Sequence, residues 1–200
     1  MRQSAQWTLL TTLGLAGGLV AGPLLGNPVG RLLNAAIGTA LIACIIGGVL
    51  GVFQAAGLRR LLAKPGWWIA ASVAGAAVGL ALGIAVVQEG GALLTGTHPR
   101  IAQLGTGMRA VSFVTIGLIA GTVLGLAQWM VLRTQRAAVR HWIFASAVAL
   151  GAAFSLASLI VDLSGVRYAS GLGLFSFLML SGAIFGSLTS WPLRSAPVEG

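Results

Sequence analysis

Apolar residues fill six long stretches of the chain, and small or polar residues recur within each stretch at helical spacing. The stretches cover roughly residues 7–26, 32–58, 67–87, 108–133, 142–163 and 171–192. A helix needs about 20 mostly apolar residues to cross the hydrocarbon core of a bilayer. The pattern therefore predicts an all-α integral membrane protein with six transmembrane helices in a single transmembrane domain, residues 1–200.

The second, fourth and sixth stretches end in a shared frame of residues. Two glycines four positions apart are followed by a polar residue and then by a leucine–arginine pair. These spacings fall on one stripe of a helix. The copies are Gly47, Gly51, Gln54, Leu58 and Arg59; Gly121, Gly125, Gln128, Leu132 and Arg133; and Gly182, Gly186, Thr189, Leu193 and Arg194.

The first, third and fifth stretches share a different frame, which begins with a tryptophan. A hydroxyl follows four positions later, small residues follow at +7, +11 and +15, and a polar residue follows at +20. The tryptophans are Trp7, Trp68 and Trp142, the hydroxyls Thr11, Ser72 and Ser146, and the +20 residues Asn27, Gln88 and Asp162. Together the two frames predict three tandem two-helix repeats, 7–59, 68–133 and 142–194.

The middle repeat is longer than the other two. From the tryptophan to the final arginine it spans 65 positions against 52 in each of the others, so it carries 13 extra residues within 88–107. Because every repeat has two spans, all three enter the membrane in the same direction, and closure around a pseudo-threefold axis is the simplest arrangement. The ALL and IAQL pieces of the insertion either lie at the membrane interface over one mouth of the bundle or form a disordered loop.

Composition agrees with a membrane bundle. The chain is 57% hydrophobic and 8% charged, against about 25% charged residues in a soluble domain. Its 30 glycines let helix backbones approach closely, which supplies the packing energy that lipid does not. No separate soluble domain is expected.

Basic residues are distributed unequally between the two sides of the predicted bundle. The N-terminal side holds Arg2, Arg59, Arg60, Lys64, Arg133, Arg136, Arg140 and Arg194, and the opposite side holds Arg31, Arg100, Arg109 and Arg167. The positive-inside rule then places both termini in the cytoplasm and the protein in the cytoplasmic (inner) membrane. The net charge of +9 is explained by topology and by attraction to lipid headgroups, so no nucleic-acid partner is expected.

Six polar side chains share a similar depth just inside the cytoplasmic interface. We expect a polar layer in which each glutamine bonds a hydroxyl on a neighbouring helix; the alternative is an axial ligand site or pore. The layer comprises Gln54, Gln128, Thr189, Thr11, Ser72 and Ser146. Each such bond is worth about 0.6–2 kcal/mol in a membrane.

A belt of tryptophan and arginine is predicted at the cytoplasmic interface. Tryptophan prefers the headgroup level, and arginine reaches lipid phosphates or stacks on indole. The belt residues are Arg59, Arg133, Arg194, Trp68 and Trp142, with Trp7, Trp129 and Trp191 beside them. Anchoring and a specific anionic-lipid pocket between repeats are both open interpretations.

A second candidate site lies at the non-cytoplasmic mouth, formed by Asn27, Gln88, Asp162 and Arg167. Asp162 is the only acid within a predicted span, which makes it a functional candidate, although pairing with Arg167 or Arg109 is an alternative role. The chain has three carboxylates and one cysteine, Cys44. No paired-carboxylate, metal-ligand or nucleophile grouping appears, so no enzyme activity, metal or named cofactor is predicted.

The phrase GLAQWMVLR, followed by a basic turn and HWIFASAVALG, resembles a group of bacterial multi-pass membrane proteins with no assigned activity. The resemblance implies a repeat-built membrane protein, although Ala55 follows Gln54 and Thr189 replaces the third glutamine. In size and span count the chain is also similar to substrate-binding subunits of vitamin transporters of the energy-coupling-factor type, without a matching ligand motif.

Two functions are compatible with these patterns. The first is a non-enzymatic scaffold or accessory subunit of a membrane complex, which docks other membrane proteins or holds lipid or pigment in the grooves between repeats. The second is a small-solute transporter or a transporter's substrate-binding subunit, with its site near the pseudo-threefold axis. The sequence names no ligand, partner subunit or oligomeric state.

Overall fold

A computed structural model describes residues 2–59, 62–95, 104–134, 141–164 and 171–194, and these residues contain helices and no strand. The helices are α1 (Arg2–Leu32), α2 (Ala35–Gly57), α3 (Pro65–Thr95), α4 (Thr106–Arg133), α5 (Trp142–Leu163) and α6 (Gly171–Arg194). Helices α1 to α5 are each long and apolar enough to cross a membrane, and the apolar stretch found in the described part of α6 is Met179–Ser190.

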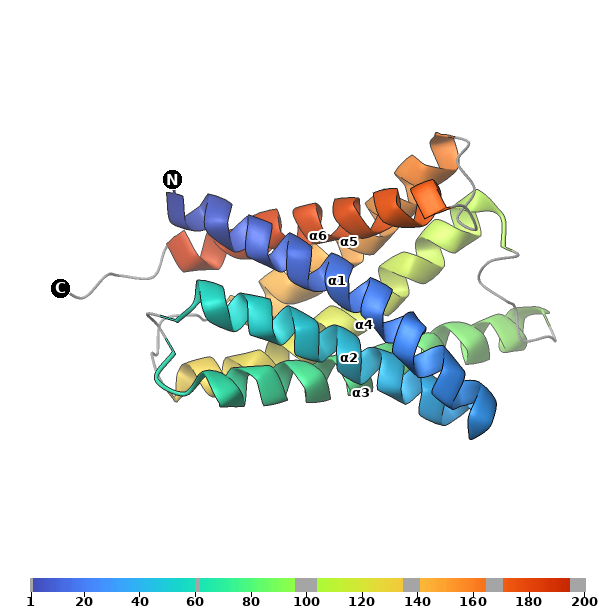
Figure 1. The fold of residues 1–200 in the computed structure, drawn as a ribbon. Helices are drawn as coiled ribbons and strands as arrows, with labels where there is room; N and C mark the ends of the chain where they lie inside the picture. The colour runs from blue at the N-terminus through green and yellow to red at the C-terminus, as the bar shows by residue number, and fades with distance from the viewer. Residues whose placement is uncertain (1, 60–61, 96–103, 135–140, 165–170, 195–200) are drawn as a thin grey trace.

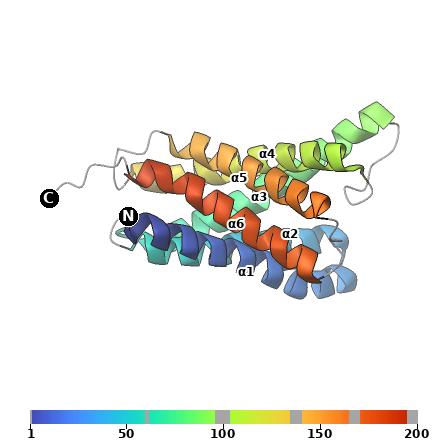
Figure 2. The same cartoon turned by 90° about the horizontal axis from the view of Figure 1, so that it is seen from above.

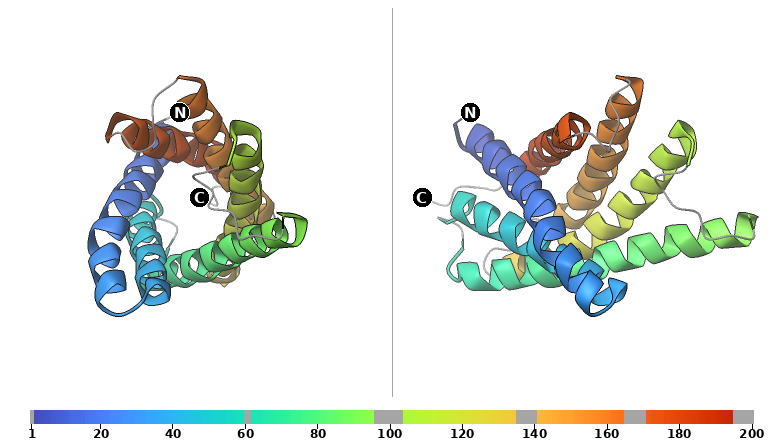
Figure 3. Two further views of the ribbon diagram at one scale, coloured as in Figure 1. Left: turned by 90° about the vertical axis from the view of Figure 1, so that its right-hand side faces the viewer. Right: turned by 45° about the vertical axis from the view of Figure 1, so that its right-hand side comes forward.

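The six helices form a closed ring. Each packs against the helices that precede and follow it in the chain, and α6 packs against α1. Figure 1 shows α1, α3 and α5 starting at the end where the N-terminus lies, with α2, α4 and α6 returning to it. The helices converge at that end and spread apart at the other (Figures 2 and 3).

The connection between α1 and α2 is shorter than the sequence pattern suggests. Helix α1 continues to Leu32 through Pro23 and Pro28, and α2 begins at Ala35 after an N-cap at Asn34. The Asn34 side chain accepts a hydrogen bond from the backbone N–H of Ile37 at 2.9 Å. The predicted end of the first helix at residue 26 and the predicted start of the second helix at residue 32 were therefore wrong. Proline is tolerated inside a helix of a membrane bundle, and asparagine caps the next helix.

Helix α3 also extends beyond its predicted end at residue 87. It continues to Thr95, so residues 92–94 of the insertion, the ALL piece, prolong a spanning helix. Leu93 on this extension is exposed. The disordered-loop alternative is therefore wrong for that piece, whereas residues 101–103 of the IAQL piece lie outside the described residues.

Glycines bring neighbouring helix backbones into direct contact. A Cβ added to Gly47 on α2 would overlap the Ser72 carbonyl oxygen on α3, and one added to Gly121 on α4 would overlap the Ser146 carbonyl oxygen on α5. A Cβ on Gly182 of α6 would lie 2.7 Å from the Thr12 Cα of α1. Any larger residue at these positions would force the helices apart.

Two hydrophobic clusters fill the ring. The larger includes Leu50, Leu124, Ala153 and Phe185 from four different helices. The smaller gathers Trp7, Trp68 and Trp142 with leucines from the ends of α2 and α4. The end of the bundle that holds these three tryptophans is called the tryptophan end below.

Candidate functional site

Three tryptophans occupy the centre of the ring at the tryptophan end. Trp142 packs edge-to-face against Trp7, with ring centroids 6.0 Å apart, and against Trp68, with centroids 5.7 Å apart. No two of their helices, α1, α3 and α5, are neighbours in the ring. The indoles can therefore meet only by reaching across its centre, in the geometry that aromatic quadrupoles favour.

This placement corrects part of the predicted lipid belt. Trp68 and Trp142 are each 0% exposed, so neither indole can contact a lipid headgroup. The belt interpretation is wrong for these two residues, because the large apolar surface of tryptophan also fills spaces between helices.

A hydrogen-bonded network of buried polar groups lies against the indoles. The Trp142 indole Nε1 donates to Gln128 Oε1 at 3.1 Å. Gln128 Nε2 donates to Gln54 Oε1 and to Ser72 Oγ, both at 2.9 Å. We call the set Gln54, Gln128, Thr189, Thr11, Ser72 and Ser146 the amide layer; all six side chains are fully buried.

The indole fixes how the glutamines are oriented. An indole N–H only donates, so Gln128 must turn its oxygen toward Trp142 and its nitrogen toward Gln54. The oxygen of Gln54 then faces Gln128. On the other side of the ring, Trp7 Nε1 donates to Thr189 Oγ1 at 3.0 Å. Two tryptophans, Trp142 and Trp7, are thus hydrogen-bonded to members of the amide layer.

The amide layer departs from the expected pairing. The expectation was that each glutamine bonds a hydroxyl, and Gln128 does bond Ser72, but Gln54 bonds Gln128 instead. Among the described residues, the polar atoms Thr11 Oγ1, Gln54 Nε2, Trp68 Nε1 and Ser146 Oγ have no partner. Such buried atoms cost about 1–3 kcal/mol each.

At the opposite end, Asp162 pairs with Arg109. Arg109 Nη1 lies 3.2 Å from Asp162 Oδ1, and Arg109 Nη2 donates to the Leu104 carbonyl at 2.8 Å. Of the two arginines considered as partners, Arg109 makes this contact, and Arg167 lies outside the described residues. The pair ties the start of α4 to the end of α5.

The other members of the candidate non-cytoplasmic site are dispersed. Asn27 on α1 and Gln88 on α3 are exposed, and Gln88 lines a shallow groove between α2 and α3. No two of α1, α3 and α5 are neighbours in the ring. Among the described residues, no contact joins Asn27, Gln88 and Asp162, and the helices that carry them spread apart at this end (Figure 3).

Cationic and aromatic side chains do reach the surface at the tryptophan end. Arg59 is exposed, and the Arg133 guanidinium carbon lies 5.1 Å from the centroid of the Trp129 ring. The side chain of Arg194 lies outside the described residues. Trp67, which the sequence analysis did not single out, is 65% exposed. The exposure of Trp67 could have been predicted from the Trp67–Trp68 doublet. Adjacent helical residues point about 100° apart, so only one of the two can face the centre of the bundle.

Two of the grooves on the outer surface of the described residues bear on the candidate sites. The larger, of about 770 Å³, lies between α3 and α4 at the tryptophan end and includes Trp67, Ala74 and Met130 in its lining. The smaller, of about 360 Å³, lies between α2 and α3. Grooves were expected between repeats, whereas the larger one lies inside the second predicted repeat.

Comparison with protein-family models, with curated proteins and with solved structures finds no match to this chain.

Proposed function

We propose that this protein is a non-enzymatic scaffold or accessory subunit of a membrane complex. In this proposal it is built from three tandem helical hairpins around a pseudo-threefold axis and acts through its outer surface. The same proposal puts the tryptophan end and both termini on the cytoplasmic side of the inner membrane, and it is supported by the basic residues at that end, including Arg59, Lys64 and Arg133. We also propose that the chain is related to the group of repeat-built bacterial membrane proteins that it resembles.

Equivalent contacts support the repeat arrangement. Gly51 faces the Ser72 side chain, with its added Cβ 2.9 Å from Ser72 Cβ, and Gly125 faces Ser146 at 2.8 Å. Gly186 approaches Thr8 and Thr11 in the same way, at 2.9 Å from the Thr8 carbonyl oxygen. These contacts join α2 to α3, α4 to α5 and α6 to α1, which are the boundaries between consecutive hairpins.

The observation that carries the proposal is the filled centre of the ring at the tryptophan end. A solute moving along the axis would have to displace three packed indoles and break the bond between Trp142 and Gln128. Backbone contact at the glycine positions leaves little freedom for the helices to rock apart. A bundle of this kind offers other proteins and lipids its outer faces.

Purification in mild detergent followed by native mass spectrometry and an absorbance spectrum tests the proposal. Protein subunits retained at a fixed stoichiometry are the expected result. A lone chain that retains one water-soluble small molecule would overturn the proposal in favour of a transporter or its substrate-binding subunit. Uptake of that molecule into proteoliposomes would then establish transport.

The Gln128→Leu variant separates the two functions at the level of a single residue. In a scaffold the amide layer holds the fold, so the variant should lose thermal stability and its partner subunits together. An intact fold that loses only a bound small molecule would instead make the layer a ligand site. Thr122→Val is the matched control, because Thr122 is exposed on the same helix and bonds only the Leu118 carbonyl of that helix.

A further inference from the structure

We propose that the groove between α3 and α4 binds one anionic phospholipid, with an acyl chain against the alanines that line it and the phosphate beside Lys64. The inference rests on the proposed membrane orientation and hairpin register, and it adds a specific lipid to the proposed scaffold. Lipid binding needs no partner protein, so the lipid proposal and the scaffold proposal can fail separately.

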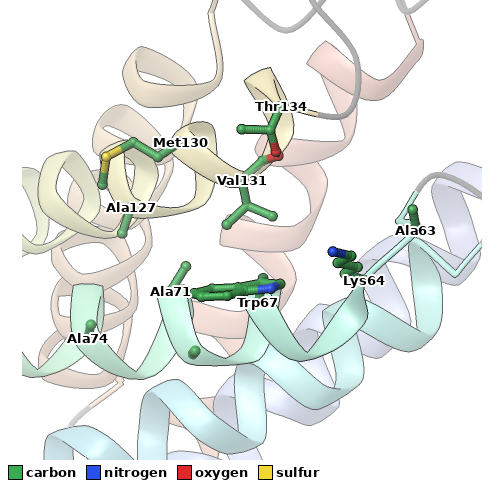
Figure 4. Close-up of a pocket in the computed structure, with 10 residues that line it drawn as sticks. Ala63, Lys64, Trp67, Ala71, Ala74, Ala127, Met130, Val131 and Thr134 are labelled. Carbon is green, nitrogen blue, oxygen red and sulfur yellow. The ribbon is translucent and has the colours of Figure 1, made fainter.

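The shape and lining of the groove suit an amphipathic guest. Its volume is about 770 Å³, and four alanines are among the residues that line it: Ala70, Ala71, Ala74 and Ala127. Figure 4 shows Trp67 lying across the groove with Lys64 at the same end, while Met130 and Ala127 line the opposite wall. An indole beside a cationic side chain at one end and an apolar lining beyond it match a headgroup and a hydrocarbon chain.

The charges at this end of the groove favour an anion. Lys64 is exposed and lines the groove. Arg133 is exposed at the same end of α4, where its guanidinium stacks on Trp129. The acids within the described residues are Glu89, near the far end of α3, and Asp162, which pairs with Arg109 at the opposite end of the bundle. The phosphate of an anionic lipid would therefore meet positive charge with no described carboxylate nearby.

The corresponding positions of the other two hairpins carry large side chains. In the proposed register, Ala70 corresponds to Leu9 and Phe144, two residues after each tryptophan. Ala74 corresponds to Leu13 and Val148, and Ala127 corresponds to Phe53 and Leu188. The leucines, phenylalanines and Val148 at these positions are larger than alanine and take up space that the alanines of the second hairpin leave open.

Native mass spectrometry of the delipidated full chain tests the inference. Phosphatidylglycerol and phosphatidylcholine with identical acyl chains are titrated separately. We expect one saturable phosphatidylglycerol adduct per chain and weaker binding of phosphatidylcholine. Lys64→Gln should weaken phosphatidylglycerol binding about fivefold, from the usual contribution of one basic residue near an anionic membrane surface. Arg59→Gln, an exposed cation at the same end outside the groove, should change it less than twofold.

Filling the groove provides an independent variant. Ala70→Leu with Ala74→Leu introduces the side chains of the first hairpin at exposed positions, and it should abolish the saturable adduct. Ala56→Leu, an exposed site on α2 outside the groove, should leave the adduct intact. Circular dichroism checks that each variant is folded, and Lys64→Gln keeps the test open if the leucine variant does not fold.

Three results would overturn the inference. Equal binding of the two lipids would remove the anionic preference, and an adduct that survives both Lys64→Gln and the leucine pair would lie elsewhere. A neutral pigment or a partner helix that occupies the groove in the native isolate, and is lost in the leucine pair, would replace the lipid. Subunits that co-purify with the leucine pair as they do with the parent chain would show that the scaffold proposal stands even if the lipid proposal fails.

Discussion

The indole N–H of Trp142 donates to the side-chain oxygen of Gln128 at 3.1 Å, and neither side chain has exposed surface. Trp142 is the first residue of α5, and Gln128 lies near the end of α4. This bond joins the aromatic cluster to the amide layer across a helix interface. It also orients the Gln128 amide toward Gln54 and Ser72, so one contact organises four side chains from α2, α3, α4 and α5.

Replacing Gln128 by leucine should destabilise the bundle by about 2–4 kcal/mol, because three hydrogen bonds are lost. The buried Trp142 N–H is then left without its acceptor, and Gln54 Oε1 is left without its donor. Thermal unfolding in detergent, followed by circular dichroism, measures the effect. The Thr122→Val control should unfold within a degree of the parent chain. Equal unfolding temperatures for Gln128→Leu and the parent would show that the network contributes nothing to stability.

Replacing Thr189 by glutamine should raise the unfolding temperature. The longer side chain can accept the Trp7 N–H, as Gln128 accepts that of Trp142, and its amide nitrogen can reach the unpartnered Ser146 hydroxyl. Satisfying a buried hydroxyl in this way is worth about 1 kcal/mol. Thr189→Val should lower the unfolding temperature, because it removes the acceptor of Trp7. A glutamine variant less stable than the valine variant would contradict the proposed equivalence of the three positions.

Replacing Gly121 by alanine should destabilise the protein or prevent its folding, because the new Cβ would overlap the Ser146 carbonyl oxygen. Overpacking of this kind costs about 1–3 kcal/mol. Gly107→Ala on the same helix is the control, since nothing lies within 4 Å of its added Cβ. For Gly121→Ala, the expression level and the height of the monodisperse size-exclusion peak in detergent should fall. Both should stay unchanged for Gly107→Ala.

Breaking the ion pair between Arg109 and Asp162 should loosen the end of the bundle opposite the tryptophans. Its side chains are 19% and 10% exposed, so we expect a loss of about 1–3 kcal/mol, between the values for surface and buried pairs. A double-mutant cycle of Arg109→Gln and Asp162→Asn measures the coupling. Additive effects of the two substitutions would mean that the pair contributes no interaction energy.

Local spacing predicted most of the helices and the depth of their polar groups. Gln128 and Ser72 were expected at one level because each lies a fixed number of residues from an end of its helix, and the structure places them 2.9 Å apart. The ends of α1 and α3 were less predictable: they were expected at residues 26 and 87, whereas the helices continue to Leu32 and Thr95. A proline or a polar residue near the end of an apolar run does not reveal whether neighbouring helices continue to support the backbone.

The sequence by itself determined that the described chain forms long apolar helices with small residues along one face, because that pattern is local and periodic. Only the tertiary structure decided which side chains face the centre. Trp68 is buried whereas Trp67 beside it is exposed, and hydrophobicity cannot distinguish them because lipid and protein interior are both apolar. The open groove beside Ala70 and Ala74 likewise depends on what α4 places opposite them, which only the packed ring fixes.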